Sequence, residues 1–264
     1  MNPTDVVDAQ KKEFKTQYKN HFYTYNSNGQ KMSVAWSGNE KKRPLILVHG
    51  SPGSYDSWAQ FLVNSDLQSK YHILVPDRPG YGGSGAGQAE LSVEKQAHSI
   101  WDVMQFNKSN LPAILIGHSY GGPVIARMAM DQPDKTAGLI FVASSVDPQL
   151  EDFKWYQNFA IWRLTRWMVP TDLVVCNDEI VALKAELNLM LPLWPKITVP
   201  TAIIQGDADN MVDPRNTAFI EKILVNGQIV SSQMIVGLNH FVPWKRPDLI
   251  FDSLQAIQVR IDKK

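Results

Sequence analysis

The sequence predicts an α/β fold: a mostly parallel, doubly wound sheet with an antiparallel N-terminal edge and an inserted helical cap. Short apolar runs rich in β-branched residues alternate along the chain with segments of helical spacing, and this alternation is typical of a parallel sheet covered by helices. A pair of strand-like segments around a turn precedes the alternation, and an aromatic stretch interrupts it later. Each feature predicts one part of the fold.

The strands follow from these runs. We expect a leading hairpin formed by 21–25 and 32–36, because Asn28-Gly29 between them is a strong turn signal. The later runs are apolar throughout, which indicates strands buried on both faces of a parallel sheet. They lie at 45–48, 73–75, 113–116, 139–142, 202–204 and 234–236.

Helices are expected between the runs. Ser92 precedes a stripe of apolar residues at helical spacing and suits an N-cap. Other helices are expected to begin near Ser119, Pro214 and Pro247. Strands and helices together make a core domain of residues 1–146 and 197–264.

The segment 147–196, the cap segment, breaks the rhythm because it is far longer than a normal connection. It is expected to form several short helices inserted into the core, either as a lid over a pocket or as a cover for apolar surface. Its aromatic residues favour the lid. They are Phe153, Trp155, Tyr156, Phe159, Trp162, Trp167 and Trp194.

Composition excludes several classes of function. The chain has 264 residues with 26 basic and 26 acidic side chains, so its formal net charge of zero gives no reason to expect a nucleic-acid partner. Cys176 is the single cysteine, so no disulfide within the chain and no Cys/His zinc cluster is expected. No apolar run reaches the ~20 residues of a spanning helix, and residues 1–20 lack a signal-peptide pattern. A cytoplasmic protein without a cofactor is expected.

A candidate nucleophile lies in Gly117-His118-Ser119-Tyr120-Gly121-Gly122, between the run 113–116 and an apolar helical pattern. Such a strand–turn–helix places a serine at a sharp turn that projects its hydroxyl above the sheet, and the glycines leave room for neighbouring backbone. The alternative is an ordinary glycine-rich turn. His118 is expected to be structural, because adjacent residues on the turn point apart.

Two backbone N–H groups are candidates for an oxyanion hole. Acyl transfer needs such donors where negative charge develops. The Tyr120 N–H follows the nucleophile, and the Ser51 N–H lies in the loop His49-Gly50-Ser51-Pro52-Gly53-Ser54 after an earlier strand, where Pro52 has no N–H to give. The alternative for this loop is a glycine-proline turn.

The serine needs a base, and the base needs a group that orients it. His240 is the only histidine C-terminal to Ser119 and follows the last strand, so it is the expected base. The expected acid is Asp209. Asp207, which could hold the local turn, and Asp147, at the end of the fourth run, remain alternatives.

These motifs resemble the α/β-hydrolase superfamily in its serine-nucleophile, esterase-like branch. The matches, spread over most of the chain in the family's order, are His49-Gly50, Asp77-Arg78-Pro79-Gly80-Tyr81-Gly82-Gly83-Ser84, the turn at Ser119, Gly206-x-x-Asp209 and His240. The resemblance implies that the second motif is a structural turn, that Asp209 is the acid and that a cap is inserted at the aromatic stretch. The similar haloalkane dehalogenases and epoxide hydrolases carry Asp where this chain has Ser119.

The expected function is hydrolysis of a carboxylic ester, or a related small acyl substrate with an apolar portion, by Ser119, His240 and Asp209. Carbon–carbon bond hydrolysis, cleavage of an N-terminal prolyl peptide bond as in a prolyl aminopeptidase, and perhydrolysis as a side activity are alternatives on the same residues. A peptidase would need acidic cap residues for an ammonium group, and Glu151, Asp152, Asp178, Glu179 and Glu186 are available. A ligand receptor without turnover is the alternative of another class.

Overall fold

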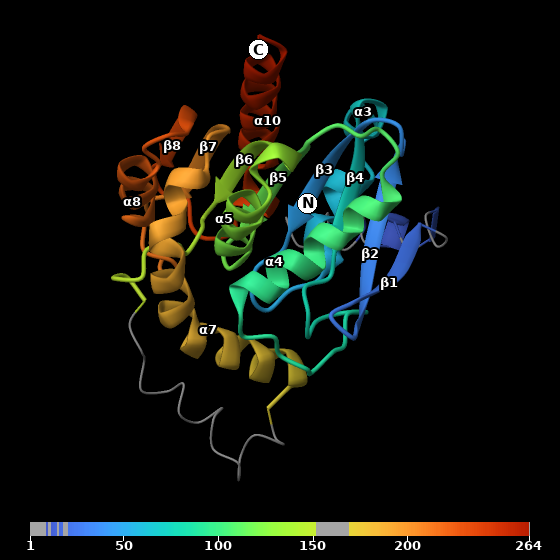
Figure 1. Cartoon of the computed structure of the whole chain (residues 1–264), viewed down its shortest axis with the longest axis horizontal. Helices are drawn as coiled ribbons and strands as arrows, with labels where there is room; N and C mark the ends of the chain where they lie inside the picture. The colour runs from blue at the N-terminus through green and yellow to red at the C-terminus, as the bar shows by residue number, and fades with distance from the viewer. Residues whose placement is uncertain (1–8, 10–11, 15, 18–20, 152–168, 264) are drawn as a thin grey trace.

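The computed structural model describes residues 21–151 and 169–263, together with residues 9, 12–14, 16 and 17. The described residues form one sheet of eight strands in the order β1-β2-β4-β3-β5-β6-β7-β8 (Figure 1). The strands are β1 (Phe22–Ser27), β2 (Gln30–Gly38), β3 (Arg43–Val48), β4 (Tyr71–Pro76), β5 (Ala113–His118), β6 (Thr136–Val142), β7 (Pro200–Gly206) and β8 (Gln228–Ile235).

The pairing confirms a mostly parallel sheet with an antiparallel edge. β1 pairs antiparallel with β2, and β2 pairs antiparallel with β4. Every later pair is parallel, from β3 with β4 and β5 to β7 with β8. The parallel strands bring their carboxyl ends to one edge of the sheet, where the loops that carry candidate site residues meet.

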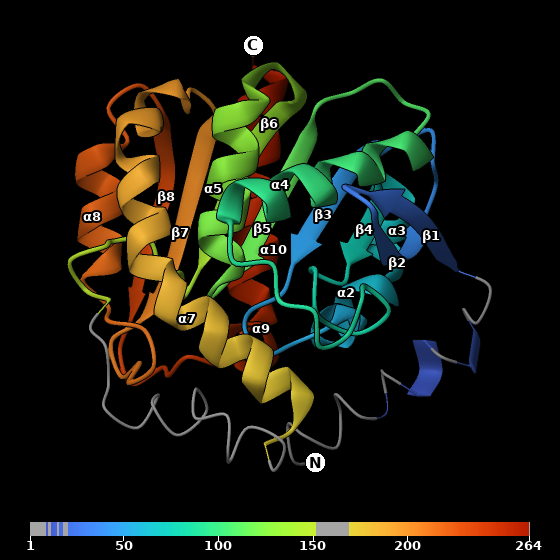
Figure 2. The same cartoon turned by 60° about the horizontal axis from the view of Figure 1, so that its bottom comes forward.

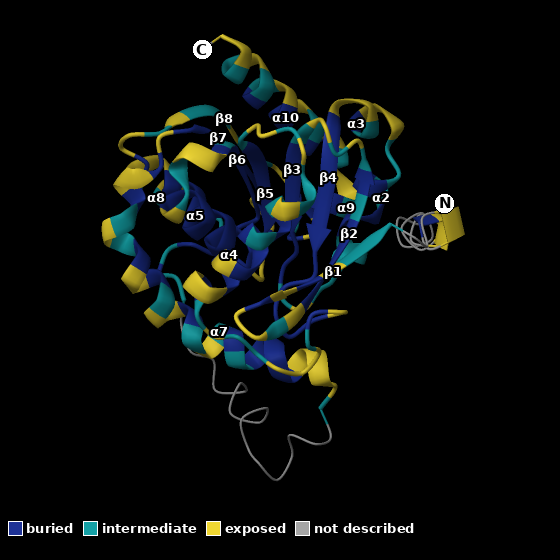
Figure 3. Cartoon of the chain, turned by 45° about the vertical axis from the view of Figure 1, so that its right-hand side comes forward, coloured by how far each residue is buried: buried dark blue, intermediate teal, exposed yellow. Residues whose placement is uncertain are grey.

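Two apolar layers enclose the sheet, because alternate residues of a strand face opposite sides. In β3, Ile46 and Val48 belong to the layer under α4, α5 and α8, whereas Leu45 and Leu47 belong to the layer under α2, α3 and α10. Figure 3 shows the inner strands β4, β3, β5, β6 and β7 as the buried centre of the molecule. The helical elements are η1 (Tyr55–Trp58), α2 (Ala59–Leu62), α3 (Ser65–Lys70), α4 (Val93–Trp101), η2 (Asp102–Phe106), α5 (Gly121–Asp131), η3 (Pro133–Lys135), α7 (Thr171–Met190), η5 (Leu191–Lys196), α8 (Asn216–Ile223), α9 (Val242–Lys245) and α10 (Pro247–Asp262).

The expectation that every later strand is buried on both faces was wrong for β8. This strand has one neighbour, β7, and lies at the edge of the sheet. Met234 remains 44% exposed, and Val236, beyond the strand end, is 87% exposed. An edge strand lacks covering elements on one side, so an apolar run can occur there without full burial.

The described part of the cap segment differs from the expected series of short helices. Residues 171–190 form the single helix α7, which runs across the carboxyl edge of the sheet (Figure 2). Six of the seven aromatic residues that favoured a lid lie outside the described residues, between 152 and 168. The seventh, Trp194, is 1% exposed and packs against Phe141 and Phe219, so it is a core residue and not part of a lid.

Candidate active site

Ser119 occupies a strained turn between β5 and α5. Its φ of +54° lies in the left-handed region, which a serine adopts at a cost of order 1–3 kcal/mol. The turn is held against β6 by a hydrogen bond of 2.9 Å from the Ser119 N–H to the Val142 carbonyl. A Cβ on Gly121 would lie 2.3 Å from the Val48 carbonyl oxygen, so only glycine fits beside β3. The local sequence therefore explains why the serine is partly exposed at the end of a buried strand.

Asp209 and His240 are in direct contact. His240 Nδ1 lies 2.8 Å from Asp209 Oδ2, and both side chains are almost fully buried. A carboxylate only accepts, so Nδ1 carries a proton, and in the neutral ring Nε2 is then the nitrogen with the free lone pair. A histidine in this tautomer can accept a proton at Nε2.

Asp209 is held as a carboxylate by its surroundings. Burial raises its pKa, but hydrogen bonds from His240 and from the N–H groups of Val212 and Met211 outweigh burial, so the pKa is lowered from its ordinary value. Gln205 also donates to Oδ2 at 3.0 Å. The Asp209 side chain is therefore fixed in place by several donors.

The two other carboxylates considered for this position contact backbone instead. Asp207 Oδ1 accepts from the Gly237 N–H at 2.6 Å and joins the loops after β7 and β8. Asp147 Oδ1 accepts from the Gln149 N–H at 2.8 Å. Of the three, Asp209 is the one that hydrogen-bonds His240.

His118 lies behind the site. Its Nε2 lies 3.0 Å from the His240 carbonyl oxygen, to which it donates, and the two rings are 4.7 Å apart. Burial, and then the nearby His240, lower the pKa of His118 to about 3. A neutral histidine that positions the His240 backbone agrees with a structural role.

Ser119 and His240 reach the same edge of the sheet from β5 and β8. Among the described residues no hydrogen bond joins Ser119 Oγ to His240, and their neighbours make the link, because His118 precedes Ser119 and donates to the His240 backbone. Hydrogen bonds between catalytic groups are often long in unliganded proteins and tighten when substrate binds. The arrangement brings the expected nucleophile and base to one place.

The oxyanion loop (49–54) lies beside Ser119. A Cβ on Gly50 would be 2.9 Å from Ser119 Cβ, so the loop backbone passes directly over the serine. Neither the Ser51 N–H nor the Tyr120 N–H donates to another group in the part of the chain that the structure describes. Two N–H groups near a serine that have no other described partner can donate hydrogen bonds to a developing oxyanion.

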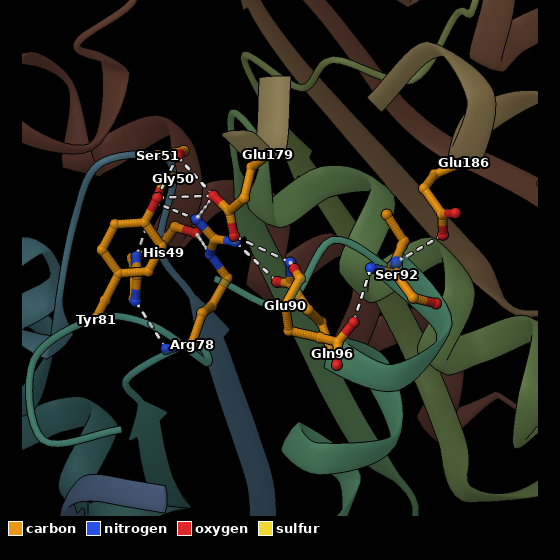
Figure 4. Close-up of polar contacts among 11 residues, drawn as sticks. His49, Gly50, Ser51, Arg78, Tyr81, Glu90, Ser92, Gln96, Glu179 and Glu186 are labelled. Carbon is orange, nitrogen blue, oxygen red and sulfur yellow. Dashed lines mark hydrogen bonds and ion pairs between the residues drawn. The ribbon is translucent and has the colours of Figure 1, made fainter. Parts of the chain in front are cut away.

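Sequence reasoning missed a buried ion pair behind this loop. Arg78 follows β4 and Glu179 lies on α7, and both side chains are fully buried with Nη1 and Oε1 2.7 Å apart (Figure 4). The motif after β4 was expected to be mainly a structural turn near the pocket, and Asp77 holds this turn by accepting from the Gly83 and Tyr55 N–H groups. The one signal for this ion pair in the sequence was Arg78, a charged residue shortly after the apolar run of β4.

Three of the acidic cap residues expected to be available for an ammonium group have partners within the protein. Glu179 pairs with Arg78, and Glu186 Oε2 accepts from the Val93 N–H at 2.8 Å. Glu151 accepts from Ser145 Oγ, and Asp152 lies outside the described residues. No group of His, Cys, Asp and Glu within the described ranges is arranged to hold a metal ion.

Comparison with known proteins identifies the fold. A family model described as the alpha/beta hydrolase fold matches residues 43–171, which include β3, the oxyanion loop and the turn at Ser119. The solved structure of an esterase from Rhodococcus sp. ECU1013 superimposes with a TM-score of 0.69, covering 90% of this chain and 98% of that one at 20% identity. The chain has the α/β-hydrolase fold.

Two curated relatives of this chain are named as lipases, which are ester-cleaving enzymes. It is 24% identical to Lipase 3 of Moraxella sp. (strain TA144), over 77% of this chain and 74% of that protein. It is 22% identical to the human monoglyceride lipase, over 94% of this chain and 92% of that protein. Over the described ranges, no helix has the length and apolarity needed to cross a membrane.

Proposed function

We propose that this protein cleaves carboxylic esters through an acyl-enzyme on Ser119, with His240 as general base and Asp209 as the acid of the triad. One observation carries the proposal: the buried hydrogen bond of 2.8 Å between Asp209 and His240, at the edge of the sheet where Ser119 stands in its strained turn. A serine hydroxyl is a weak nucleophile without such a base, and the base needs an orienting group.

The proposed reaction has two halves. His240 Nε2 takes the proton from Ser119 Oγ as the oxygen attacks the ester carbonyl carbon, and His240 then gives that proton to the leaving alkoxide. In the second half, His240 takes a proton from water as the water oxygen attacks the acyl carbon. It then returns that proton to Ser119 Oγ as the acyl–Oγ bond breaks and the carboxylic acid leaves. Asp209 accepts from Nδ1 throughout and stabilises the charged imidazolium that forms in each half.

The oxyanion of each tetrahedral intermediate is proposed to bind to the Ser51 and Tyr120 N–H groups. Both groups are free of other described partners, and Tyr120 directly precedes the first turn of α5, whose N-terminal end favours negative charge. Donors that are already in position contribute most when charge develops, because they need no reorganisation.

The cap segment is proposed to form the roof of the substrate site, with residues 1–146 and 197–264 as the core domain. The position of α7 across the carboxyl edge supports this division. Phe241 and Met211, next to His240 and Asp209, are 46% and 57% exposed. Apolar side chains around the reacting groups favour an ester with an apolar acyl or alcohol portion.

A series of p-nitrophenyl esters of increasing acyl length tests the function. We expect turnover by the wild type and a loss of at least about a thousandfold in Ser119→Ala, since removing a triad member leaves only binding and oxyanion stabilisation. Ser109→Ala, in the loop before β5, is the matched control and is expected to hydrolyse the esters like the wild type. Wild-type turnover by Ser119→Ala would refute the proposal, and a fluorophosphonate label found on Ser119 by mass spectrometry would support it.

A further inference from the structure

Both partners of the ion pair between Arg78 and Glu179 are hydrogen-bonded to the oxyanion loop. Arg78 uses every N–H of its guanidinium: Nε donates to the His49 carbonyl, Nη1 to Gln96 and Glu179, and Nη2 to Glu179 and to the Gly50 carbonyl at 3.0 Å. Such complete use of a buried arginine is a requirement for burying its charge without a large penalty. The oxyanion loop, α4 and α7 therefore all contact the side chain of Arg78, which itself lies in the β4–α4 connection (Figure 4).

Arg78 controls the orientation of the peptide that carries the proposed oxyanion donor. The Gly50 carbonyl and the Ser51 N–H belong to the same planar peptide, and in a trans peptide they point in opposite directions. The Gly50 oxygen accepts from Arg78 Nη2 and lies 2.8 Å from His49 Nδ1, the donor of a second hydrogen bond. With the carbonyl fixed on one side, the Ser51 N–H is fixed on the other.

Glu179 holds the same residue by its side chain. The Ser51 hydroxyl donates to Glu179 Oε2 at 2.7 Å, and Tyr81 donates to the same oxygen at 2.7 Å. Oε1 accepts from Gln96 at 3.0 Å in addition to Arg78. Glu179 therefore fixes Ser51 directly and also orients the arginine that fixes the preceding carbonyl.

We propose that Glu179 of α7 is a positioning residue for the oxyanion hole, which it orients through the Ser51 hydroxyl and Arg78. The inference rests on the proposed function, because it assigns the Ser51 N–H a role in the reaction. It makes α7 part of the catalytic apparatus and not only a cover, since the helix supplies the carboxylate that holds the donor peptide in place. Displacement of α7 would then lower the rate of the chemical step.

The helix has a second carboxylate that serves as a matched control. Glu186, two turns further along α7, accepts from the Val93 N–H at the start of α4. It anchors α7 to the core without touching the oxyanion loop. If Glu179 merely anchored the helix, the two glutamates would behave alike.

The experiment compares Glu179→Gln, Ser51→Ala, the double variant, Glu186→Gln and the wild type on one p-nitrophenyl ester. We expect Glu179→Gln to lower kcat about 10- to 100-fold with KM within about twofold, somewhat less than the ~10²–10³-fold lost when an oxyanion donor is removed outright. Ser51→Ala keeps its N–H but loses the hydroxyl anchor, so kcat is expected to fall about fivefold or more. Glu186→Gln is expected to keep kcat within about twofold of the wild type.

The double variant decides whether Glu179 acts through Ser51. Effects of residues in one chain of contacts do not multiply, so the double variant is expected within about twofold of Glu179→Gln alone. Multiplied effects, a wild-type kcat in Glu179→Gln, or a change confined to KM would overturn the inference. If Glu179→Gln does not fold, Ser51→Ala decides, because it leaves the ion pair intact, and a wild-type kcat there overturns the inference.

Failure of the inference can be told apart from failure of the proposed function. Ser119→Ala is measured beside the other variants. Turnover that survives in Ser119→Ala overturns both the proposed function and the role of the Ser51 N–H. Turnover lost in Ser119→Ala but unchanged in Glu179→Gln overturns the positioning role alone.

Discussion

Asp209 and His240 lie on the two loops that follow the neighbouring strands β7 and β8, whereas Ser51 is held by residues from the β4–α4 connection, α4 and α7. Asp209 is held by short-range contacts, such as those from the Met211 and Val212 N–H groups. Ser51 depends on Glu179, which is 128 residues away in the chain. The acid and the proposed oxyanion donor therefore differ in how far apart in sequence their supports lie.

This difference predicts different sensitivities. A site supported by its own loop tolerates changes elsewhere in the molecule, while a site held by a buried ion pair depends on the docking of a distant helix. We therefore expect substitution of Asp209 to lower activity with little loss of stability, and substitutions that leave one partner of the ion pair unpaired to lower both activity and stability. Four predictions test this contrast.

The largest effect is expected for Asp209→Asn. An amide in place of the carboxylate allows the wrong tautomer of His240, which in a serine triad lowers kcat by about 10³–10⁴-fold. Steady-state kinetics on a p-nitrophenyl ester measures this, and urea unfolding is expected to show a much smaller change in the free energy of unfolding. Asp207→Asn, on the same loop, is the control and should retain kcat within about threefold; an equal loss in both variants would contradict the assignment of the acid.

The next largest effect is expected on stability for Arg78→Leu. Glu179 would remain buried without its partner, and breaking such a pair costs about 3–5 kcal/mol. The double variant Arg78→Leu/Glu179→Leu removes both charges and is expected to recover part of that free energy. Urea denaturation of the three proteins measures the effect, and a double variant less stable than Arg78→Leu would show that the cost does not come from the unpaired charge.

A smaller effect is expected in the pH dependence of stability through His118. Its pKa is lowered by burial to about 3 from its ordinary value of 6.5, so its contribution to stability is fully present above pH 6.5 and is lost as the pH falls towards 3. Between pH 6.5 and pH 5 this loss amounts to about 2 kcal/mol. His118→Gln keeps an N–H for the His240 carbonyl and cannot be protonated, so its free energy of unfolding should fall less over this range.

The comparison with the wild type isolates His118, because the buried His49 and His72, whose pKa values are also lowered by burial, are present in both proteins. Urea unfolding at the two pH values gives the difference. Equal slopes in the two proteins would mean that the His118 pKa is not depressed.

The smallest effect is expected for Tyr120→Phe. The Tyr120 hydroxyl is buried and, within the described residues, makes no hydrogen bond, so its removal should leave the free energy of unfolding unchanged or raise it by up to about 1 kcal/mol. The backbone N–H remains, so kcat should stay within about twofold. A selective rise in KM would show that substrate bonds to the hydroxyl, and the backbone assignment would then be incomplete.

Much of the fold could be predicted from the sequence, because the signals for it lie within short segments. The turn at Asn28-Gly29, the N-cap Ser92 and the glycine-bounded Ser119 each fix a short segment through its own backbone, and each is where the sequence predicts it. The errors fall where packing partners decide. Trp194 carries the same aromatic signal as a lid residue, yet η5 brings it back against Phe141 of the core.

The sequence by itself determined the order of strands and helices and the positions of Ser119, Asp209 and His240 at strand ends, because hydrophobic period and turn chemistry are local properties. Only the tertiary structure decided that Asp209, and neither Asp207 nor Asp147, contacts His240. It also decided that Glu179 on α7 holds the oxyanion loop through Arg78 and Ser51. A contact between residues so far apart in the chain depends on how helices pack over the sheet, and no short motif records it.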